Sequence, residues 1–251
     1  MSPTIYIKEN TLLRLQLTKR RERFFFLTMT ILGLATIFSS IWPTLAWQVK
    51  TLPRLTGSID QIPIPQAQVL SAKTLLANDV QVVENPDGFS YFTTNYRPPA
   101  HSSQRLSEST TGGPRPQKFQ VTIPRLKIEK ATARVDNLDF YQSLSHFPGS
   151  ALPGEIGNSF ITGHSVLPQF ANSQNYRAIF TNLSDLEIGD DVFIQTEGQT
   201  LHFVVQYAKV VNPHDLSVLL PISASGRNLT LMTCVPPGTN LKRLVVITSL
   251  I

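Results

Sequence analysis

The longest uninterrupted apolar segment covers residues 24–47 and contains no ionisable side chain. As a helix, its 24 residues would span about 36 Å, against about 30 Å for the hydrocarbon core of a bilayer. Trp42 and Trp47 are expected near the membrane interface, where amphipathic rings are favoured. Residues 44–46 resemble a signal-peptide cleavage site, but the apolar part of such a peptide is only about 7–15 residues long. The pattern therefore predicts a retained transmembrane helix.

Basic side chains gather just before this helix. Residues 1–23 hold six Lys or Arg and two acidic residues, whereas residues 24–251 hold 16 basic and 15 acidic residues. Because basic flanks stay on the cytoplasmic side, the tail is predicted in the cytoplasm and the rest of the chain outside the cell membrane. A nucleic-acid-binding domain would carry its basic stripe on the folded part, so nucleic acid is excluded as a predicted partner.

Residues 48–117 lack a sustained hydrophobic period and contain many Pro, Ser, Thr and Gly residues. Such composition is typical of a flexible linker, although an apolar run at 69–77 is compatible with one helix. The pattern changes at residue 118. The predicted organisation is a basic cytoplasmic tail (1–23), a transmembrane helix (24–47), an extracellular linker or pre-domain (48–117) and a compact domain (118–251).

Short β-rich segments separated by turn residues characterise the compact domain. In one of them Leu201, Phe203, Val205 and Tyr207 alternate with other residues, as a half-buried strand requires. Strands are predicted at 119–123, 126–135 (bent after Pro124), 158–162, 191–196, 201–211, 228–234 and 244–248, and short helical turns at 140–144, 176–183 and 214–219. Frequent short strands predict a mainly β fold, as a closed or nearly closed barrel.

The chain has one cysteine, Cys234, which excludes an internal disulfide and a cysteine-based zinc cluster. Cys234 ends one predicted strand, and Arg243 begins the next after an eight-residue loop. If the two strands pair as a hairpin, these residues lie opposite each other. The guanidinium of Arg243 can then stabilise a thiolate or an oxyanion formed when sulfur attacks a carbonyl.

A nucleophilic cysteine also needs a group that moves protons. His164 follows Gly163 at the end of an apolar strand, so its imidazole is expected at the mouth of the barrel. We predict a catalytic trio of Cys234 as nucleophile, His164 as acid and base, and Arg243 as oxyanion stabiliser. Residues 166–177 are expected to form a loop beside His164 that shapes a substrate groove.

The residues around this trio resemble the sortase family, the cysteine transpeptidases of bacterial surfaces. The similarity runs in order through about 118–251 and is carried by IPRLKI (123–128), HFPGSALPGEIGN (146–158), ITGHS (161–165), TLMTCVP (230–236) and RLVV (243–246). The resemblance implies a closed eight-stranded sortase-type β-barrel with short helices, behind the transmembrane helix and flexible linker.

The resemblance also implies the reaction. Cys234 would cleave the Thr–Gly bond of a Leu-Pro-x-Thr-Gly-like sorting signal in a secreted protein, and an amine would resolve the thioacyl intermediate. The implied acceptors are a peptidoglycan precursor, for cell-envelope anchoring, or a pilin lysine, for pilus assembly. No cofactor or metal is expected, since Glu187, Asp190 and Asp191 favour a solvated turn over a calcium site. Two alternatives remain open: a thiol peptidase with water as acceptor, and a non-catalytic surface binding module.

Overall fold

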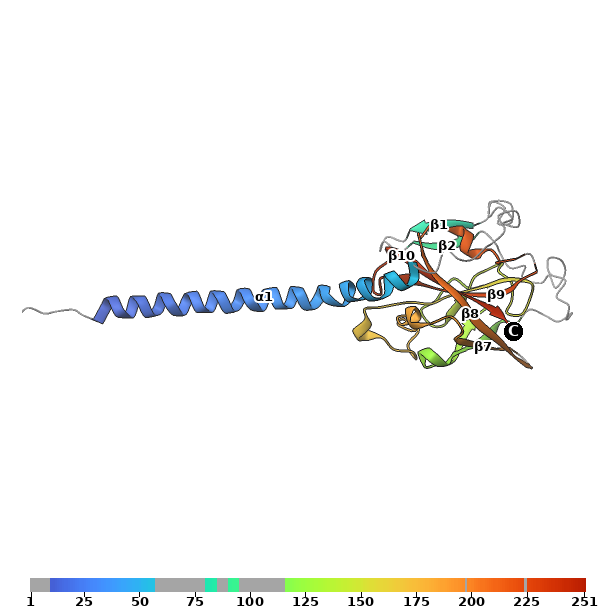
Figure 1. Cartoon of the computed structure of the whole chain (residues 1–251), viewed down its shortest axis with the longest axis horizontal. Coiled ribbons are helices and arrows are strands. Elements are labelled where there is room, and N and C mark those ends of the chain that lie inside the picture. Colours follow the sequence, from blue (N-terminus) through green and yellow to red (C-terminus); the bar gives the residue numbers. More distant parts are fainter. Residues whose placement is uncertain (1–9, 57–79, 85–89, 95–115, 197, 224) are drawn as a thin grey trace, which may run out of the picture. The chain divides into compact units, whose positions relative to one another are not determined.

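The computed structural model of the chain describes residues 10–56, 80–84, 90–94, 116–196, 198–223 and 225–251 (Figure 1). The chain divides into two compact units, Met1–Ala46 and Trp47–Ile251. The apolar run at 69–77 lies outside the described residues.

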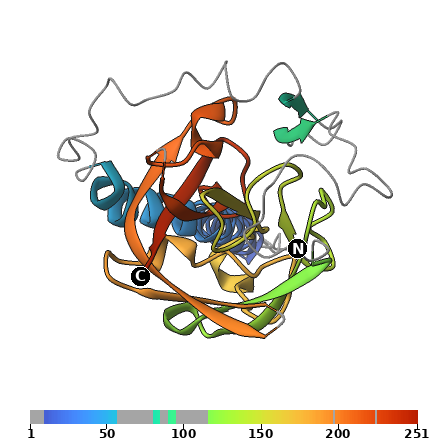
Figure 2. The same cartoon turned by 90° about the vertical axis from the view of Figure 1, so that its right-hand side faces the viewer.

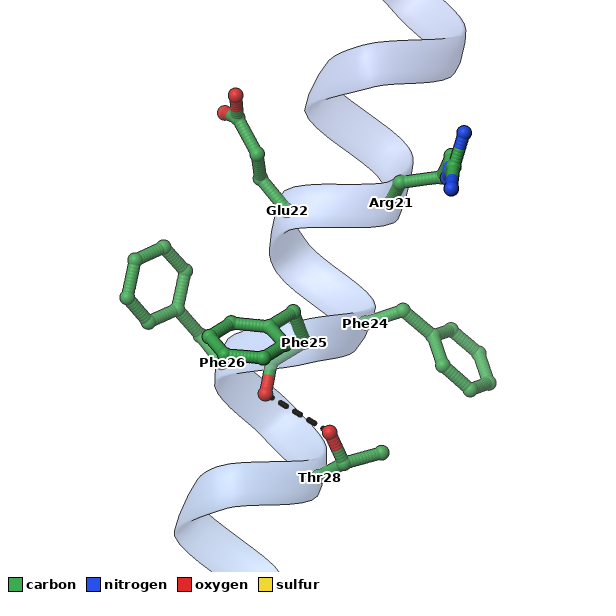
Figure 3. A pocket seen from close by; sticks show the side chains of 6 residues that line it. All are labelled: Arg21, Glu22, Phe24, Phe25, Phe26 and Thr28. Atoms are coloured by element: carbon green, nitrogen blue, oxygen red, sulfur yellow. Dashed lines mark hydrogen bonds between the residues drawn. The ribbon is translucent and has the colours of Figure 1, made fainter.

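Helix α1 (Asn10–Thr56) contains the apolar segment. Its part Arg21–Thr51 has a mean hydropathy of 2.0 and is long and apolar enough to cross a membrane, as the sequence predicted. Figure 3 shows the start of this part, where Arg21 and Glu22 precede three phenylalanines whose rings point away from the helix axis. The side chains that line the hollow here all come from this one helix.

The last turns of α1 contradict one expectation. Trp47 and Leu55 are buried in the same core cluster as the barrel interior, and both belong to the unit Trp47–Ile251. The indole Nε1 of Trp47 donates a hydrogen bond to Ser184 Oγ at 3.3 Å. Trp47 was predicted at the membrane interface, and this was wrong because its ring finds apolar neighbours and a polar partner in the folded domain.

Eight strands close into a barrel in the order β10-β8-β7-β3-β4-β5-β6-β9, as the family resemblance implied (Figures 1 and 2). All neighbours pair antiparallel except β4 with β5 and β6 with β9, which are parallel. The strands are β3 (Lys118–Ile123), β4 (Ile128–Arg134), β5 (Leu144–His146), β6 (Gly157–Thr162), β7 (Asp191–Thr196), β8 (Gln199–Val211), β9 (Arg227–Val235) and β10 (Lys242–Leu250).

Seven of these strands were predicted, and β5 was not. The sequence predicted a helical turn at 140–144, which is wrong: residues 141–143 form bends, and Leu144 begins β5. Leu144 and Ser145 pair in parallel with Ala133 and Arg134 of β4. A three-residue strand has no detectable period of its own, so only the distant partner strand determines it.

Short 3₁₀ turns connect the strands. η3 (Pro124–Leu126) produces the bend predicted at Pro124, and Lys127 then adopts a left-handed φ of 55° before β4 begins. The others are η4 (Pro168–Phe170), η5 (Leu183–Asp185) and η6 (Leu216–Leu219). The last lies within the turn predicted at 214–219.

A separate two-stranded sheet lies inside the predicted linker. β1 (Val80–Glu84) and β2 (Ser90–Thr94) pair antiparallel, with Val82 opposite Phe92. At least these ten residues of the predicted linker or pre-domain (48–117) therefore have regular backbone pairing.

Apolar side chains cover both faces of the wall made by β6, β9 and β10. Leu229 and Leu231 of β9 point into the barrel, whereas Met232 belongs to a second cluster outside it. This outer cluster consists of Phe147, Phe160, Val211, Val218, Leu219, Met232, Val245 and Ile247. Because the wall is buried on both sides, β10 contains a continuous apolar run at 244–247, whereas β6 and β9 also bury polar side chains such as Asn158 and Thr230.

Candidate active site

Cys234 and Arg243 are direct cross-strand partners in β9 and β10, as predicted from the hairpin. The neighbouring pair on the same face is Met232 with Val245, and both belong to the outer cluster. Since side chains two residues apart share a face of a strand, the thiol and the guanidinium lie on the outer face of the barrel wall. Cys234 is half-buried, and Arg243 is only 2% exposed.

The guanidinium of Arg243 is held by the turn that joins the two strands. Its Nη1 donates to the carbonyl oxygens of Asn240, at 2.9 Å, and Lys242, at 3.0 Å. Burial raises the pKa of the Cys234 thiol above its ordinary value, and the positive charge of Arg243 acts in the opposite direction. Arg243 is thus close enough to stabilise negative charge on or near the sulfur.

His164 lies next to Cys234 because β6 runs parallel to β9. The last paired residues are Thr162 and Met232, each two positions before His164 and Cys234. Hydrogen bonds keep the segments together beyond the strand end: Thr233 Oγ1 donates to the Gly163 carbonyl at 2.8 Å, and Ser165 Oγ donates to the Cys234 carbonyl at 2.6 Å. The three predicted residues therefore come from three neighbouring strand ends.

Gly163 is required where β6 turns toward the site. A Cβ atom there would lie 2.5 Å from a ring carbon of Phe180 and 2.9 Å from Leu144 Cδ2. Both neighbours are completely buried, so neither can move away easily. The glycine lets the backbone pass close over the core and place the next residue at the site.

The imidazole of His164 lies against two aromatic rings that the sequence did not predict. Its ring centroid is 4.2 Å from that of Phe140 and 4.6 Å from that of Tyr141, with interplanar angles of 51° and 52°. The guanidinium carbon of Arg177 lies 5.5 Å from the centroid of the Tyr141 ring. The only sequence signal for these contacts was a pair of adjacent aromatics in a stretch wrongly assigned to a helical turn.

This environment keeps His164 uncharged. Its pKa is lowered to about 4, mainly by burial and also by the positive charge of Arg177, while the negative charge of Asp139 acts in the opposite direction. Nε2 of His164 is buried and has no hydrogen-bond partner among the described residues. These pKa shifts favour a neutral imidazole at His164 and a protonated thiol at Cys234.

Two loops meet at the edge of the site. A Cβ atom on Gly238, whose φ is 80°, would lie 2.9 Å from the backbone nitrogen of Leu167. The loop after His164 therefore packs closely on the turn between β9 and β10. From these loops Phe170 and Leu241 expose 65% and 63% of their surface. Each of the two loops at the edge of the site thus exposes a large apolar side chain.

A second cluster, made by His146, Ser150 and Asp136, has the residue types of a serine hydrolase but not its geometry. His146 Nε2 lies 2.9 Å from the Ala151 carbonyl oxygen, which can only accept, so this nitrogen carries the proton. Ser150 Oγ, 3.1 Å from the same nitrogen, donates to the Phe147 carbonyl. A protonated Nε2 cannot activate the hydroxyl, and the cluster is structural.

Among the residues described by the structure, no group of three or more His, Cys, Asp or Glu side chains could hold a metal ion. Arg125 Nη2 donates to Glu187 Oε1 at 2.9 Å, and its Nη1 lies 4.0 Å from Asp190 Oδ1. Asp191 instead pairs with His202, at 2.7 Å. The acids considered for calcium thus have cationic or histidine partners.

The family model of the sortase domain matches residues 118–251. No curated protein matches the chain. Solved structures similar to it include a sortase D5 transpeptidase from Clostridium perfringens, with 25% identity over 54% of this chain and 79% of that chain (TM-score 0.45). A lid mutant of sortase A from Corynebacterium diphtheriae is 31% identical over 55% and 72% (TM-score 0.46). Sortase C-1 from Actinomyces oris is 28% identical over 53% and 72% (TM-score 0.46).

Proposed function

The chain belongs to the sortase family, and from this premise we propose that it is a membrane-anchored cysteine transpeptidase acting through Cys234, His164 and Arg243. The observation that carries the proposal is the direct pairing of Cys234 with Arg243, with His164 beside them at the end of the adjacent parallel strand. A nucleophile, a proton carrier and a fixed cation are the groups that acyl transfer to sulfur requires.

In the proposed reaction, Cys234 Sγ attacks the carbonyl carbon of the scissile peptide bond. The thiol proton passes to His164, and the carbonyl oxygen becomes an oxyanion near the Arg243 guanidinium. When the C–N bond breaks, His164 returns the proton to the leaving amine, and the acyl group stays on sulfur as a thioester. An incoming amine then attacks the thioester carbonyl and loses a proton to His164. When the C–S bond breaks, His164 passes this proton to the departing sulfur, and the free thiol of Cys234 is restored.

The resting pair in this scheme is a neutral thiol and a neutral imidazole. The pKa of His164 is about 4 and that of Cys234 is raised, so one proton stays on the pair across the neutral range. Because two coupled groups share this proton, the activity profile reports the protonation of the pair. Protonation of His164 gives the acid limb, and loss of the shared proton gives the alkaline limb.

The proposed donor is a secreted protein with a Leu-Pro-x-Thr-Gly-type sorting signal, and the proposed acceptor is the amine of a peptidoglycan precursor or a pilin lysine. The exposed apolar side chains of Phe170 and Leu241 suit a peptide with apolar residues. We propose that residues 24–47 anchor the protein in the cell membrane, with the basic tail in the cytoplasm and the barrel outside.

A cleavage and transfer assay tests this proposal. The full chain in detergent micelles is given a Leu-Pro-x-Thr-Gly peptide, with and without an amine acceptor such as triglycine, and the products are identified by mass. We expect cleavage at Thr–Gly and a ligated product that grows with amine concentration. Cys234→Ala and His164→Ala should each abolish both products, whereas His202→Ala, which removes a surface histidine, should leave them unchanged.

Each other outcome has a defined meaning. Cleavage with no ligated product at any amine concentration would indicate the thiol peptidase. Undiminished cleavage by Cys234→Ala would overturn the catalytic assignment. A wild-type chain that binds the peptide but never cleaves it would favour the surface binding module.

A further inference from the structure

The aromatic contacts of His164 come from the connection between β4 and β5. Phe140 and Tyr141 both lie within ring-contact distance of the imidazole, and Arg177 lies over the Tyr141 ring. Tyr141 remains 53% exposed, so its ring is in contact with the imidazole and is also open to solvent. We call Phe140, Tyr141 and Arg177 the histidine clamp.

The segment that carries the clamp is held in place at its base. Leu138 packs against the outer cluster, and Ser145 Oγ donates to the carbonyl of Asn137. Asn137 Oδ1 accepts from the Asp139 amide at 3.2 Å, and Asp139 Oδ1 accepts from the Tyr141 amide at 2.9 Å. These bonds fix the backbone immediately before the two rings, so the rings are presented to His164 by an ordered turn.

Charged groups also act on the imidazole. Arg177 and Asp139 have opposite effects on its pKa, and Tyr141, Cys234 and Arg243 are further ionisable residues around the site. The rings of Phe140 and Tyr141 supply the apolar contact that removes water. Loss of either ring would admit water to the imidazole and also let it rotate about its side-chain bonds.

We propose that Phe140 and Tyr141, with Arg177 over Tyr141, are positioning residues that fix the orientation of His164 and keep it available as a neutral base for the Cys234 proton. This inference rests on the proposed function. It adds a specific requirement, because the reacting histidine depends on two rings that take no part in the proton or acyl transfer. The pKa of His164 is lowered to about 4 with burial as its largest cause, which agrees with this role.

Titration of His164 tests the clamp without any turnover. The full chain in detergent micelles is labelled with ¹³C at the histidine rings, and the His164 signal is assigned by its loss in His164→Gln. In the wild type we expect the midpoint near the pKa of about 4. Tyr141→Ala and Phe140→Ala should each raise it by about one unit or more toward the ordinary value of about 6.5. Tyr141→Phe, which keeps the ring, should stay within about half a unit of the wild type.

A matched control exists elsewhere on the barrel. Phe193 stacks on His202 with centroids 4.6 Å apart, so Phe193→Ala removes an equivalent ring from a different histidine. It should leave the His164 midpoint unchanged. If an alanine variant does not fold, Phe140→Leu and Tyr141→Leu remove aromaticity with less loss of volume. An unchanged midpoint in every folded clamp variant would overturn the inference.

Kinetics separate positioning from simple structural support. Tyr141→Ala should lower kcat about tenfold at pH 7 with little change in KM, because the base loses its orientation and not its substrate contacts. Its acid limb should move up in pH together with the titration midpoint, and Tyr141→Phe should restore both. If the wild-type chain has no activity but the variants still show these midpoint shifts, the proposed function is contradicted and the clamp is supported. If the wild type is active and the clamp variants keep both full activity and the wild-type midpoint, only the clamp is contradicted.

Discussion

At the scale of single residues, burial and nearby charges have different effects on the ionisation of the site residues. Burial raises the pKa of Cys234 and lowers that of His164, so both effects favour the neutral forms. Arg243 is the fixed positive charge beside the sulfur, and two backbone carbonyls hold it in position. Its effect should therefore be greatest when negative charge develops during the reaction, and small in the resting enzyme.

Arg243 variants test this difference. Arg243→Ala should reduce kcat/KM by about 10²–10³, the usual effect of removing one oxyanion donor. Arg243→Lys should recover part of this activity, because it keeps the charge but loses the planar fork. Arg227→Ala removes an exposed arginine at the opposite end of β9 and should have no effect.

Because Arg243 is 2% exposed, the fold of each variant needs a check by circular dichroism. A folded Arg243→Ala chain with wild-type kcat/KM would remove Arg243 from the mechanism.

At the scale of secondary-structure elements, the site depends on β6 ending directly beside β9. Gly163 makes this possible, since its missing side chain leaves room for Phe180 and Leu144. The alignment of His164 with Cys234 follows from backbone pairing and from the hydroxyl bonds of Thr233 and Ser165. The elements thus bring together residues about 70 positions apart in the chain.

Gly163→Ala should destabilise the barrel by about 1–3 kcal/mol, because the new Cβ overlaps two buried side chains. Urea denaturation of the full chain in detergent, followed by tryptophan fluorescence, measures this, since Trp47 is packed in the same unit as the barrel. The double variant Gly163→Ala/Phe180→Leu should lose less than the sum of its single variants, because the smaller side chain makes room. Strict additivity, or an unchanged midpoint for Gly163→Ala, would refute the steric explanation.

The sequence predicted local arrangements better than distant ones. The pairing of Cys234 with Arg243 was predictable because one short turn joins their strands. Strand β5 was missed because its three residues are defined by pairing with β4 and β6. The contacts of His164 with Phe140 and Tyr141 were missed for the same reason, since they depend on the path of a turn-rich segment over the outer cluster.

Trp47, near the end of α1, also makes a distant contact that the local sequence did not predict. The apolar pattern correctly predicted a helix long enough to span a membrane. Near its end, however, an amphipathic ring suits both a lipid interface and a protein core. The hydrogen bond to Ser184, 137 residues away, could not be inferred from local sequence.

At the scale of the whole molecule, the chain combines a basic tail, an apolar helix and a nearly neutral barrel. This distribution suits the enzyme proposed above, which is held at a membrane and acts on secreted substrates. A nearly neutral barrel also has no general electrostatic attraction for nucleic acid. The chain has one thiol, so any thiol-linked adduct must be on Cys234.

The most direct test of the central claim is the intact mass of the full chain after brief mixing with a Leu-Pro-x-Thr-Gly peptide in the absence of an added amine. The account predicts a wild-type adduct whose mass equals the peptide up to threonine minus one water, which hydroxylamine removes as expected of a thioester. The adduct should be absent from Cys234→Ala and should disappear when triglycine is added, with formation of the ligated peptide. Cleavage of the peptide by wild type and Cys234→Ala alike, with no adduct in either, would contradict the account.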